Sequence, residues 1–372
     1  MFTIEMLPAD EGDALWIEYG SNPVRRILID CGRKTAYRAV AERIVGSDRS
    51  FELFVLTHVD ADHITGAVSL LQDARFGPEK VKDVWFNGWL HLNGLHWRHE
   101  GDGPGVLGAQ QGEFFGALLR GRGYPWNAAF EGMPVVIPDD GPLPRIELEG
   151  SMVLTLLGPT ADKVRDMRER WERDLGQADP AKRIDPGDYE RALEILGEDA
   201  RQGPDVLGGG HEGPIVIQDL LEVPFNADGS EPNGSSISFL AELDRKAVLF
   251  AGDAHSPQVE ASVRRLLKER GLQRLPLDAL KMSHHGSARN SSSELLELLE
   301  CSRYLISTDG TRHHHPDPVT LARALDATGR GVEFHFNYAS DESLLWDDEQ
   351  LRRDHGFKTF FPNGKTGLKV AL

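Results

Sequence analysis

The stretch THVDADH, residues 57–63, places four side chains of metal-ligand type directly after the apolar run 51–56. These side chains are His58, Asp60, Asp62 and His63. A short apolar run bounded by turn residues is typical of a strand covered on both faces. Side chains diverge in the loop that follows, so the four groups can serve two adjacent ions. In the structural alternative, His58 ends the strand and Asp62 caps the next helix. Four ligand types in six positions favour the metal site.

Three further polar clusters stand where predicted strands end. They are Asp30 in LIDCG, Asp253 in FAGDA, and the pair His284 and His285 in SHHGS. A helical pattern follows each of them. Strand, polar turn and helix in repetition are typical of an α/β fold whose chemistry lies at the strand ends.

The predicted elements can be given by their residue numbers. Strands are predicted at 15–19, 27–30, 51–56, 247–251 and 277–282, and the first two are expected to form a hairpin. Helices are predicted at 36–45, 65–71, 258–269 and 292–299. Two stretches, about 87–133 and 160–232, interrupt the pattern, and we interpret them as insertions in a single domain of residues 1–372.

The composition limits the class of protein. The chain has 372 residues, of which 40% are hydrophobic and 27% charged, and this excludes a disordered, collagen-like or coiled-coil chain. No apolar run approaches the roughly 18–20 residues of a membrane helix, so no membrane contact is expected. The two cysteines cannot form a disulfide framework. The first residues do not have the pattern of a signal peptide, so a cytoplasmic location is predicted.

The charge balance is acidic. Lys and Arg number 41 against 59 Asp and Glu, a net charge of −18. Proteins that coat duplex nucleic acid usually carry a basic surface, which this chain as a whole lacks. Net charge does not exclude a local basic groove.

The four strand-end clusters, LIDCG, HVDADH, FAGDA and SHHGS in this order, resemble the metallo-β-lactamase-fold hydrolases. The similarity is greatest to the ComEC-like branch, which includes the hydrolase domain of the bacterial DNA-uptake channel and freestanding relatives. EGDALWIEYG (11–20) and STDGTRHHHPDPVTLARAL (307–325) also match. The resemblance covers nearly the whole chain apart from the two insertions. It implies an αββα sandwich, two internally similar halves and a dinuclear metal site along one edge.

The resemblance also implies a role for each cluster residue. One ion would be bound by His58 and Asp60, and a second by Asp62 and His63, with Asp253 bridging the two. Asp62, which would also hold the attacking water, is a predicted catalytic residue together with His58 and Asp60.

Residues around the ions also receive roles from the resemblance. Either His284 or His285 would complete the second ion's shell, and the other would contact substrate or support a ligand. Asp30 would orient the ligand loop by hydrogen bonding, as residues behind metal ligands commonly do. His315, in HHHPDP, would lie near the site.

The sequence departs from the common pattern of the superfamily at two positions. Asp60 stands where that pattern has His, although the ComEC-like branch shares the Asp. The His expected before the strand that precedes Asp253 is missing, and Asn233 is the nearest candidate ligand, with Glu231 another. If neither reaches the metal, the first ion site is weak or empty. Both departures replace nitrogen with oxygen, which favours Mn²⁺ somewhat over Zn²⁺.

The function that follows is metal-dependent hydrolysis of a phosphodiester by a metal-activated water, with a DNA or RNA nuclease as the leading hypothesis. One alternative is a hydrolase of a small ester, lactone or cyclic-nucleotide-type substrate. The other is a subunit of a multi-protein, defence-type system in which the metal site is mainly structural and the protein partners are unknown.

Overall fold

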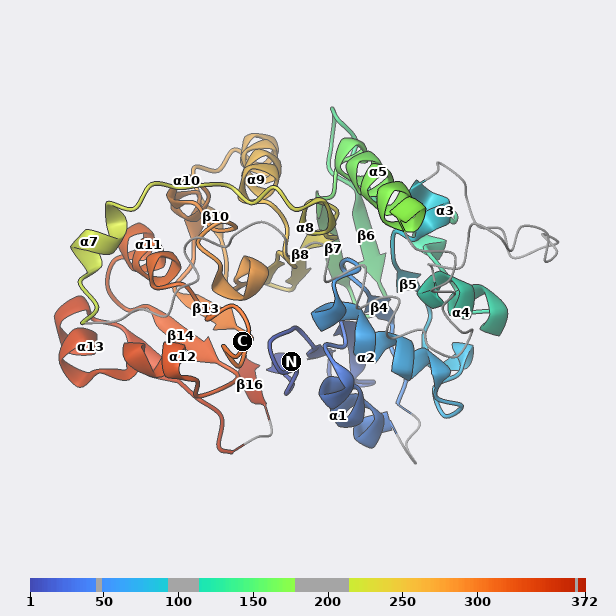
Figure 1. Ribbon diagram of the computed structural model, residues 1–372, viewed down its shortest axis with the longest axis horizontal. Coiled ribbons are helices and arrows are strands. Elements are labelled where there is room, and N and C mark those ends of the chain that lie inside the picture. The colour runs from blue at the N-terminus through green and yellow to red at the C-terminus, as the bar shows by residue number, and fades with distance from the viewer. Residues whose placement is uncertain (45–48, 93–113, 178–213, 365–366) are drawn as a thin grey trace.

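Two β-sheets lie face to face at the centre of the protein in a computed structural model (Figure 1). The structure describes residues 1–44, 49–92, 114–177, 214–364 and 367–372. Residues 93–113 and 178–213, which form a large part of the two predicted insertions, lie outside the described residues.

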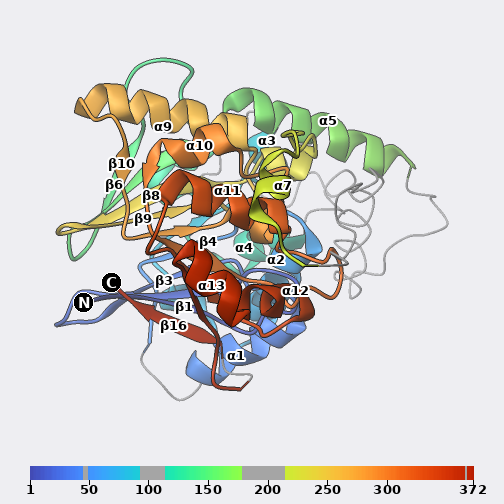
Figure 2. The ribbon, with the colours of Figure 1, turned by 90° about the vertical axis from the view of Figure 1, so that its left-hand side faces the viewer.

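The first sheet has six strands in the order β16-β1-β2-β3-β4-β5. Their bounds are Phe2–Met6 (β1), Leu15–Tyr19 (β2), Arg25–Ile29 (β3), Leu53–Val55 (β4), Val84–Trp85 (β5) and Leu368–Ala371 (β16). β2 pairs antiparallel with β3, which confirms the predicted hairpin, whereas β3, β4 and β5 are parallel. Met6 pairs with Leu368, so the last strand of the chain lies beside the first, and both termini are close together (Figure 2).

The second sheet has eight strands in the order β15-β14-β13-β11-β9-β8-β7-β6. Their bounds are Arg145–Leu148 (β6), Met152–Gly158 (β7), Ser238–Leu243 (β8), Lys246–Phe250 (β9), Ala279–Lys281 (β11), Arg303–Ile306 (β13), Glu333–Phe336 (β14) and Lys358–Phe360 (β15). Strands β10 (Leu275–Pro276) and β12 (Leu299–Glu300) form a separate parallel pair.

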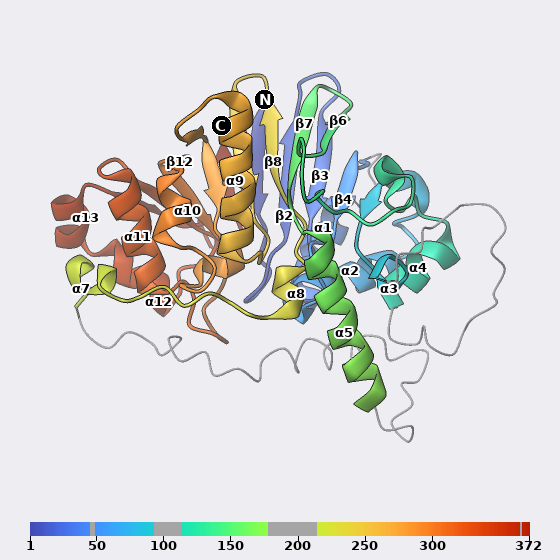
Figure 3. The ribbon, with the colours of Figure 1, turned by 90° about the horizontal axis from the view of Figure 1, so that it is seen from above.

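Helices cover the outer faces of both sheets (Figure 3). On the side of the first sheet lie α1 (Lys34–Ile44), α2 (Ala61–Gln72), α3 (Trp89–Leu92) and α4 (Phe114–Arg122). On the other side lie α9 (Ser256–Arg270), α10 (Ser293–Glu297), α11 (Pro318–Thr328), α12 (Asp341–Leu344) and α13 (Glu349–His355). The remaining helices are α5 (Ala161–Gln177), α7 (Ile217–Leu221) and α8 (Glu231–Gly234).

The alternation of side chains along the strands of the first sheet explains these layers, because successive side chains of a strand point to opposite faces of the sheet. In β3, Ile27 and Ile29 join the core between the sheets, whereas Leu28 joins the core under α1, α2 and α4. Leu53 and Val55 of β4 face the same way as Ile27, and Phe54 faces the helices. The chain therefore has the predicted αββα sandwich.

The predicted strands and helices around the site are present with small shifts at their ends. The run predicted at 51–56 forms β4 (Leu53–Val55), and the helix predicted at 65–71 begins earlier, at Ala61 in α2 (Ala61–Gln72). Among the described residues, no helix is long and apolar enough to cross a membrane.

Candidate metal centre

The loop from β4 into α2 carries the four candidate ligands of residues 57–63. Asp60 occupies the position before α2 with an extended backbone (φ −66°, ψ 145°), and its side chain makes no capping hydrogen bond. Asp62 lies within the first turn of α2, where the helix dipole favours a carboxylate. The structural alternative, in which Asp62 caps this helix, is therefore wrong.

Asp30 orients this loop through hydrogen bonds to three groups. Its carboxylate accepts from the Thr57 amide (2.7 Å), the Thr57 hydroxyl (2.8 Å) and His63 Nδ1 (2.8 Å). With Nδ1 donating to Asp30, the lone pair of the neutral His63 ring is on Nε2, the nitrogen that faces the other candidate ligands. The resemblance implied this orienting position for Asp30.

One group of candidate ligands contains His58, His63 and Asp253, whose ligand atoms lie within 4.8 Å of one another. His58 Nε2 lies 3.7 Å from Asp253 Oδ2 and 3.6 Å from Asp60 Oδ2. Asp253 follows β9, so this group joins the first sheet to the second.

A second group contains Asp62, His63 and His285. His285 Nε2 lies 3.2 Å from Asp62 Oδ2 and 3.3 Å from His63 Nε2. His285 Nδ1 contacts the Ser307 carbonyl oxygen at 2.8 Å and must donate to it, because a carbonyl only accepts. In the neutral form that binds metal, both rings would turn the lone pair of Nε2 toward the 3.3 Å gap between them, where a cation could accept both.

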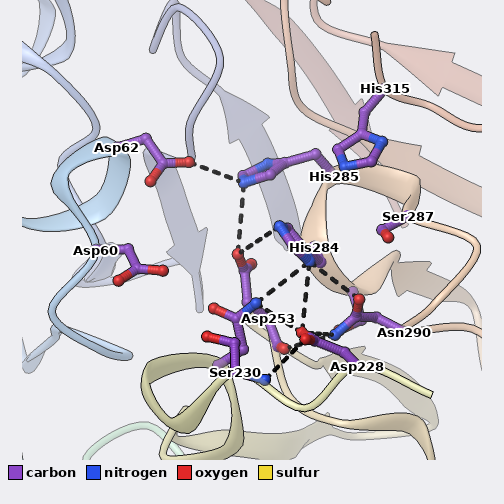
Figure 4. Close-up of polar contacts among 12 residues, drawn as sticks. Asp60, Asp62, Asp228, Ser230, Asp253, His284, His285, Ser287, Asn290 and His315 are labelled. Carbon is purple, nitrogen blue, oxygen red and sulfur yellow. Dashed lines mark hydrogen bonds and ion pairs between the residues drawn. The ribbon is translucent and has the colours of Figure 1, made fainter. Parts of the chain in front are cut away.

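Asp253 contacts members of both groups, and Figure 4 shows it beside His284 and His285. Its Oδ2 atom is 3.3 Å from His63 Nε2, 3.6 Å from His285 Nε2 and 3.9 Å from His284 Nε2. Burial disfavours the charged carboxyl, yet His63, His285 and His284 hold the pKa of Asp253 well below its usual range. This central position is the one that a bridging ligand requires.

The turn after β11 separates the two adjacent histidines. His284 and His285 both have positive φ, at 47° and 54°, in the left-handed region that residues other than glycine rarely occupy. The turn directs His285 toward Asp62 and His63, whereas His284 Nδ1 contacts Asn290 Oδ1 at 3.0 Å (Figure 4). The sequence left open which histidine completes the second group, and the geometry favours His285.

Opposite charges dominate the electrostatics of the second group. Burial disfavours protonation of His285, but Asp253 and Asp13, with Asp62, raise its pKa to about 10. In the same way, His63 and His285 hold the pKa of Asp62 well below its usual range against the effect of burial. The protein thus provides a site of strong negative potential, suited to a positive charge.

The structure also places the two candidates for the missing histidine. Asn233, in α8, is buried, and its Nδ2 donates to Asp228 Oδ2 at 2.7 Å. The Glu231 carboxylate lies 3.8 Å from Arg170 in an ion pair. Of the two, Asn233 is adjacent to the site, because its Nδ2 lies 3.3 Å from His284 Nδ1.

His315 lies beside His284, with ring centroids 5.3 Å apart and the rings nearly perpendicular. It is buried, and its Nδ1 is 3.6 Å from Asp317 Oδ2. The structure therefore places His315 near the candidate metal centre (Figure 4).

Residues that the sequence did not single out support the site. Asp228 accepts hydrogen bonds from Asn233 and Asn290. Asp13 forms a buried ion pair with Lys281 at 2.7 Å and lies 3.6 Å from His285 Nδ1. Asp13 stands in the motif EGDALWIEYG and Lys281 two residues before SHHGS, and these positions are the signals that could have identified them.

The donor atoms fit divalent metal ions. Within the described part of the chain, four buried atoms of the candidate ligands have no hydrogen-bond partner: His58 Nε2, Asp60 Oδ1, Asn233 Oδ1 and Asp253 Oδ1. A buried polar atom left unpaired costs about 1–3 kcal/mol. Bound cations would satisfy these atoms, since imidazole nitrogen and carboxylate or amide oxygen are common metal ligands.

Comparison with known proteins gives little further guidance. No family model matches the sequence, and no curated protein matches it. Among solved structures, the chain is similar to a mutant of the CmlA beta-hydroxylase, at 10% sequence identity and a TM-score of 0.40. The match covers 100% of this chain and 54% of the other, so the chain spans about half the length of that solved chain.

Proposed function

We propose that this chain is a metal-dependent hydrolase that binds two divalent ions. The first ion would be held by His58, Asp60 and Asn233, and the second by Asp62, His63 and His285. Asp253 would bind both ions. The observation that carries the proposal is the position of Asp253 between two groups of ligand-type side chains. In addition, four buried atoms of the proposed ligands have no hydrogen-bond partner within the described residues: His58 Nε2, Asp60 Oδ1, Asn233 Oδ1 and Asp253 Oδ1.

The two donor sets differ in their chemistry. The first set offers one imidazole nitrogen with oxygens from Asp60, Asn233 and Asp253. The second offers two imidazole nitrogens with oxygens from Asp62 and Asp253. Oxygen-rich sets suit Mn²⁺ better than Zn²⁺, so we propose Mn²⁺ ahead of Zn²⁺, above all at the first site.

Divalent ions held there would polarise a phosphoryl oxygen and lower the pKa of a water molecule toward neutrality. The residues of the chain determine the side from which a substrate can approach. The side chains of His58, His63, Asp253 and His285 are at most 3% exposed and form the buried floor of the site. Those of Asp60, Asp62 and His284 are 17%, 20% and 21% exposed. A substrate would thus meet Asp62, which we propose to accept a proton from water, together with His284.

We propose a phosphodiester as the substrate, in DNA or RNA. Two ions bound next to each other suit an in-line displacement at phosphorus, because they stabilise both the attacking and the leaving oxygen. The resemblance of the sequence motifs to the ComEC-like hydrolases supports the same substrate class. The net charge of −18 favours a short contact with the polymer around the site over extensive coating of a duplex.

The test combines metal analysis with nuclease assays. The purified protein is expected to contain up to two metal ions per chain and to release nucleotides from single- or double-stranded DNA or RNA with Mn²⁺, Mg²⁺ or Zn²⁺. Bound metal without nucleotide release would refute the nuclease assignment, and activity on small esters or cyclic nucleotides would then support the first alternative. Retained biological activity in an Asp62→Ala/His63→Ala variant would support a subunit with a structural metal. Failure to bind any metal would refute the proposal as a whole.

A further inference from the structure

Asp228 lies just outside the candidate metal centre, in the segment before α8, and holds two amide side chains. Its Oδ2 atom accepts from Asn233 Nδ2 at 2.7 Å and from Asn290 Nδ2 at 3.0 Å, and its Oδ1 accepts from the Ser230 amide at 2.9 Å (Figure 4). A charged carboxylate offers only acceptor atoms. Each amide must therefore turn its nitrogen toward Asp228.

This contact fixes the direction of the Asn233 oxygen. An amide side chain has its nitrogen and oxygen on opposite branches, so turning Nδ2 toward Asp228 turns Oδ1 away from it. Asn233 is 3% exposed, and within the described residues its Oδ1 has no hydrogen-bond partner. An unpaired buried oxygen is costly unless something positive lies next to it.

The same carboxylate fixes the direction of Asn290. Asn290 Nδ2 also donates to the Asp253 carbonyl oxygen at 3.0 Å, and its Oδ1 lies 3.0 Å from His284 Nδ1. That contact requires a proton on His284 Nδ1. The His284 ring then has its lone pair on Nε2, 3.9 Å from Asp253 Oδ2. Asp228 thus orients groups on both sides of His284.

We propose that Asp228 is a positioning residue that turns the Asn233 carbonyl oxygen toward the first ion and so lets an asparagine serve where the superfamily pattern has a histidine. This inference rests on the proposed function, because it concerns the first of the two proposed ion sites. The asparagine side-chain amide can point either its oxygen or its nitrogen toward the ion, and only the oxygen can bind a cation. A partner that selects the oxygen-facing orientation therefore raises the affinity of the site for the cation. Partners behind metal ligands commonly contribute 10- to 100-fold in metal affinity.

The experiment measures Mn²⁺ binding by titration calorimetry, with metal content determined on the same samples. The wild-type protein is expected to bind two Mn²⁺ ions per chain. Asp228→Asn removes the charged acceptor with little change in shape, and it is expected to weaken one of the two sites by about 10- to 100-fold while the other is unchanged. Asn233→Ala is expected to weaken the same site with Asp228 intact.

A double variant provides the rescue. In Asp228→Asn/Asn233→Asp the donor and acceptor of this pair are exchanged, so that hydrogen bond is kept and a carboxylate oxygen still faces the ion, while Asn290 Nδ2 loses one of its acceptors. This variant is expected to bind the first ion within a few-fold of the wild type. The matched control is Asp83→Asn, because Asp83 is also a buried carboxylate that accepts hydrogen bonds, from the amides of Ala128 and Ala129. It is expected to bind both ions as the wild type does.

The outcomes separate the two proposals. A wild-type protein that binds no Mn²⁺ refutes the metal-dependent function and this inference with it. A wild type with two sites, together with unchanged affinities in Asp228→Asn or in Asn233→Ala, refutes only the role of Asp228. Should Asp228→Asn not fold, Asn233→Ala and the double variant still decide the question.

Discussion

Asp253 Oδ2 lies within 4 Å of four imidazole rings, those of His58, His63, His284 and His285. A single carboxylate therefore connects ligand candidates that come from two different sheets. Since both proposed ions share this side chain, its loss should weaken the binding of both ions. Loss of Asn233 or His285 should weaken the binding of only one ion.

We expect Asp253→Asn to lower the affinity for both metal ions by more than about 100-fold, because a direct ligand contributes more than the partners behind it. Hydrolytic activity should fall at least in proportion. The measurement is metal content after dialysis, followed by calorimetry. Asp278→Asn is the control. Asp278 lies just before β11, away from the candidate metal centre, and accepts hydrogen bonds from the Lys246 side chain and the Ala247 amide. Asp253→Asn protein that keeps either ion at wild-type affinity would contradict the bridging role.

A second prediction at the level of single residues concerns His91, in α3. His91 is buried, its Nδ1 accepts from the Gly88 amide and its Nε2 donates to the Gly132 carbonyl oxygen. Burial lowers the pKa of His91 to about 4. The ring binds a proton near pH 6.5 in the unfolded chain, but only near pH 4 in the folded chain. Unfolding therefore takes up a proton between these two pH values. As a result, the free energy of unfolding falls as the pH is lowered from about 6.5 to about 4.

For the wild-type protein, His91 should reduce the free energy of unfolding by on the order of 1–2 kcal/mol between pH 7 and pH 5. His91→Gln should therefore show a shallower decline in stability over this range, measured by urea unfolding at a series of pH values. His355→Gln, at the end of α13, is the control and should keep the wild-type slope. Equal slopes in wild type and His91→Gln would show that His91 does not titrate in this way.

At the level of elements, the position of α2 depends on a close contact with the loop after β3. A Cβ atom added to Gly66, in the middle of α2, would lie 2.0 Å from the Cys31 carbonyl oxygen and 2.7 Å from that of Arg33. Gly66 also donates its amide to the Gly32 carbonyl oxygen at 2.8 Å. Because α2 carries Asp62 and His63, this contact sets the position of two proposed ligands.

Gly66→Ala should therefore push α2 away from the loop, destabilise the protein by about 1–3 kcal/mol and weaken metal binding. Gly121→Ala, in α4, is a matched control, since a Cβ there would meet no atom within 4 Å. That substitution should be neutral or stabilise the helix by up to about 1 kcal/mol. The two variants can be compared by chemical unfolding and by Mn²⁺ titration. Wild-type stability of Gly66→Ala would refute the close contact.

The elements also show what could be predicted from the sequence. Apolar runs such as 51–56 and 247–251 end in polar residues, so the strand ends that carry His58 and Asp253 could be located without a structure. The αββα architecture followed from the resemblance of the motifs, and the structure confirms it. The structure brings the predicted ligands together, and their roles in metal binding and catalysis stay predictions.

The contacts of Asp228 could not be predicted. Its neighbourhood, NADGSEPNG (226–234), is composed of turn-forming residues, and nothing in that pattern distinguishes a carboxylate at the site from one in a loop. Its contact with Asn290 depends on how the segment before α8 packs against the turn after β11, which is tertiary information. The separation of His284 from His285 likewise depends on two backbone angles that the sequence does not specify.

For the whole molecule, the two sheets are joined by more than apolar packing. Asp13 follows β1 and Lys281 ends β11, and their side chains form a 2.7 Å ion pair in which both are at most 2% exposed. Burial disfavours the charged Asp13, but Lys281 and His285 hold the pKa of Asp13 below its usual range. This contribution to stability is present above the carboxyl's unfolded pKa, near 3.8, and is lost as the pH falls through its lower folded value.

Lys281→Met should destabilise the protein by about 3–5 kcal/mol, because it removes the lysine partner of the buried Asp13 charge. Asp13→Asn/Lys281→Met should lose much less, since neither charge remains. Lys246→Met breaks a half-exposed pair with Asp278 and should change stability by at most about 1 kcal/mol. Urea unfolding at pH 7 gives all three values. A loss below 1 kcal/mol for Lys281→Met would mean that the pair does not hold the sheets together.

The pairing of β1 with β16 has a consequence for how the chain is made. During synthesis, β1 leaves the ribosome about 360 residues before its partner Leu368–Ala371, since Met6 pairs with Leu368. At about 5–20 residues per second, the outer edge of β1 therefore waits on the order of tens of seconds for the strand that covers it. An uncovered edge strand can pair with another chain. The nascent protein should thus be prone to aggregation until β16 is complete, and a variant truncated before Leu368 should remain in that state.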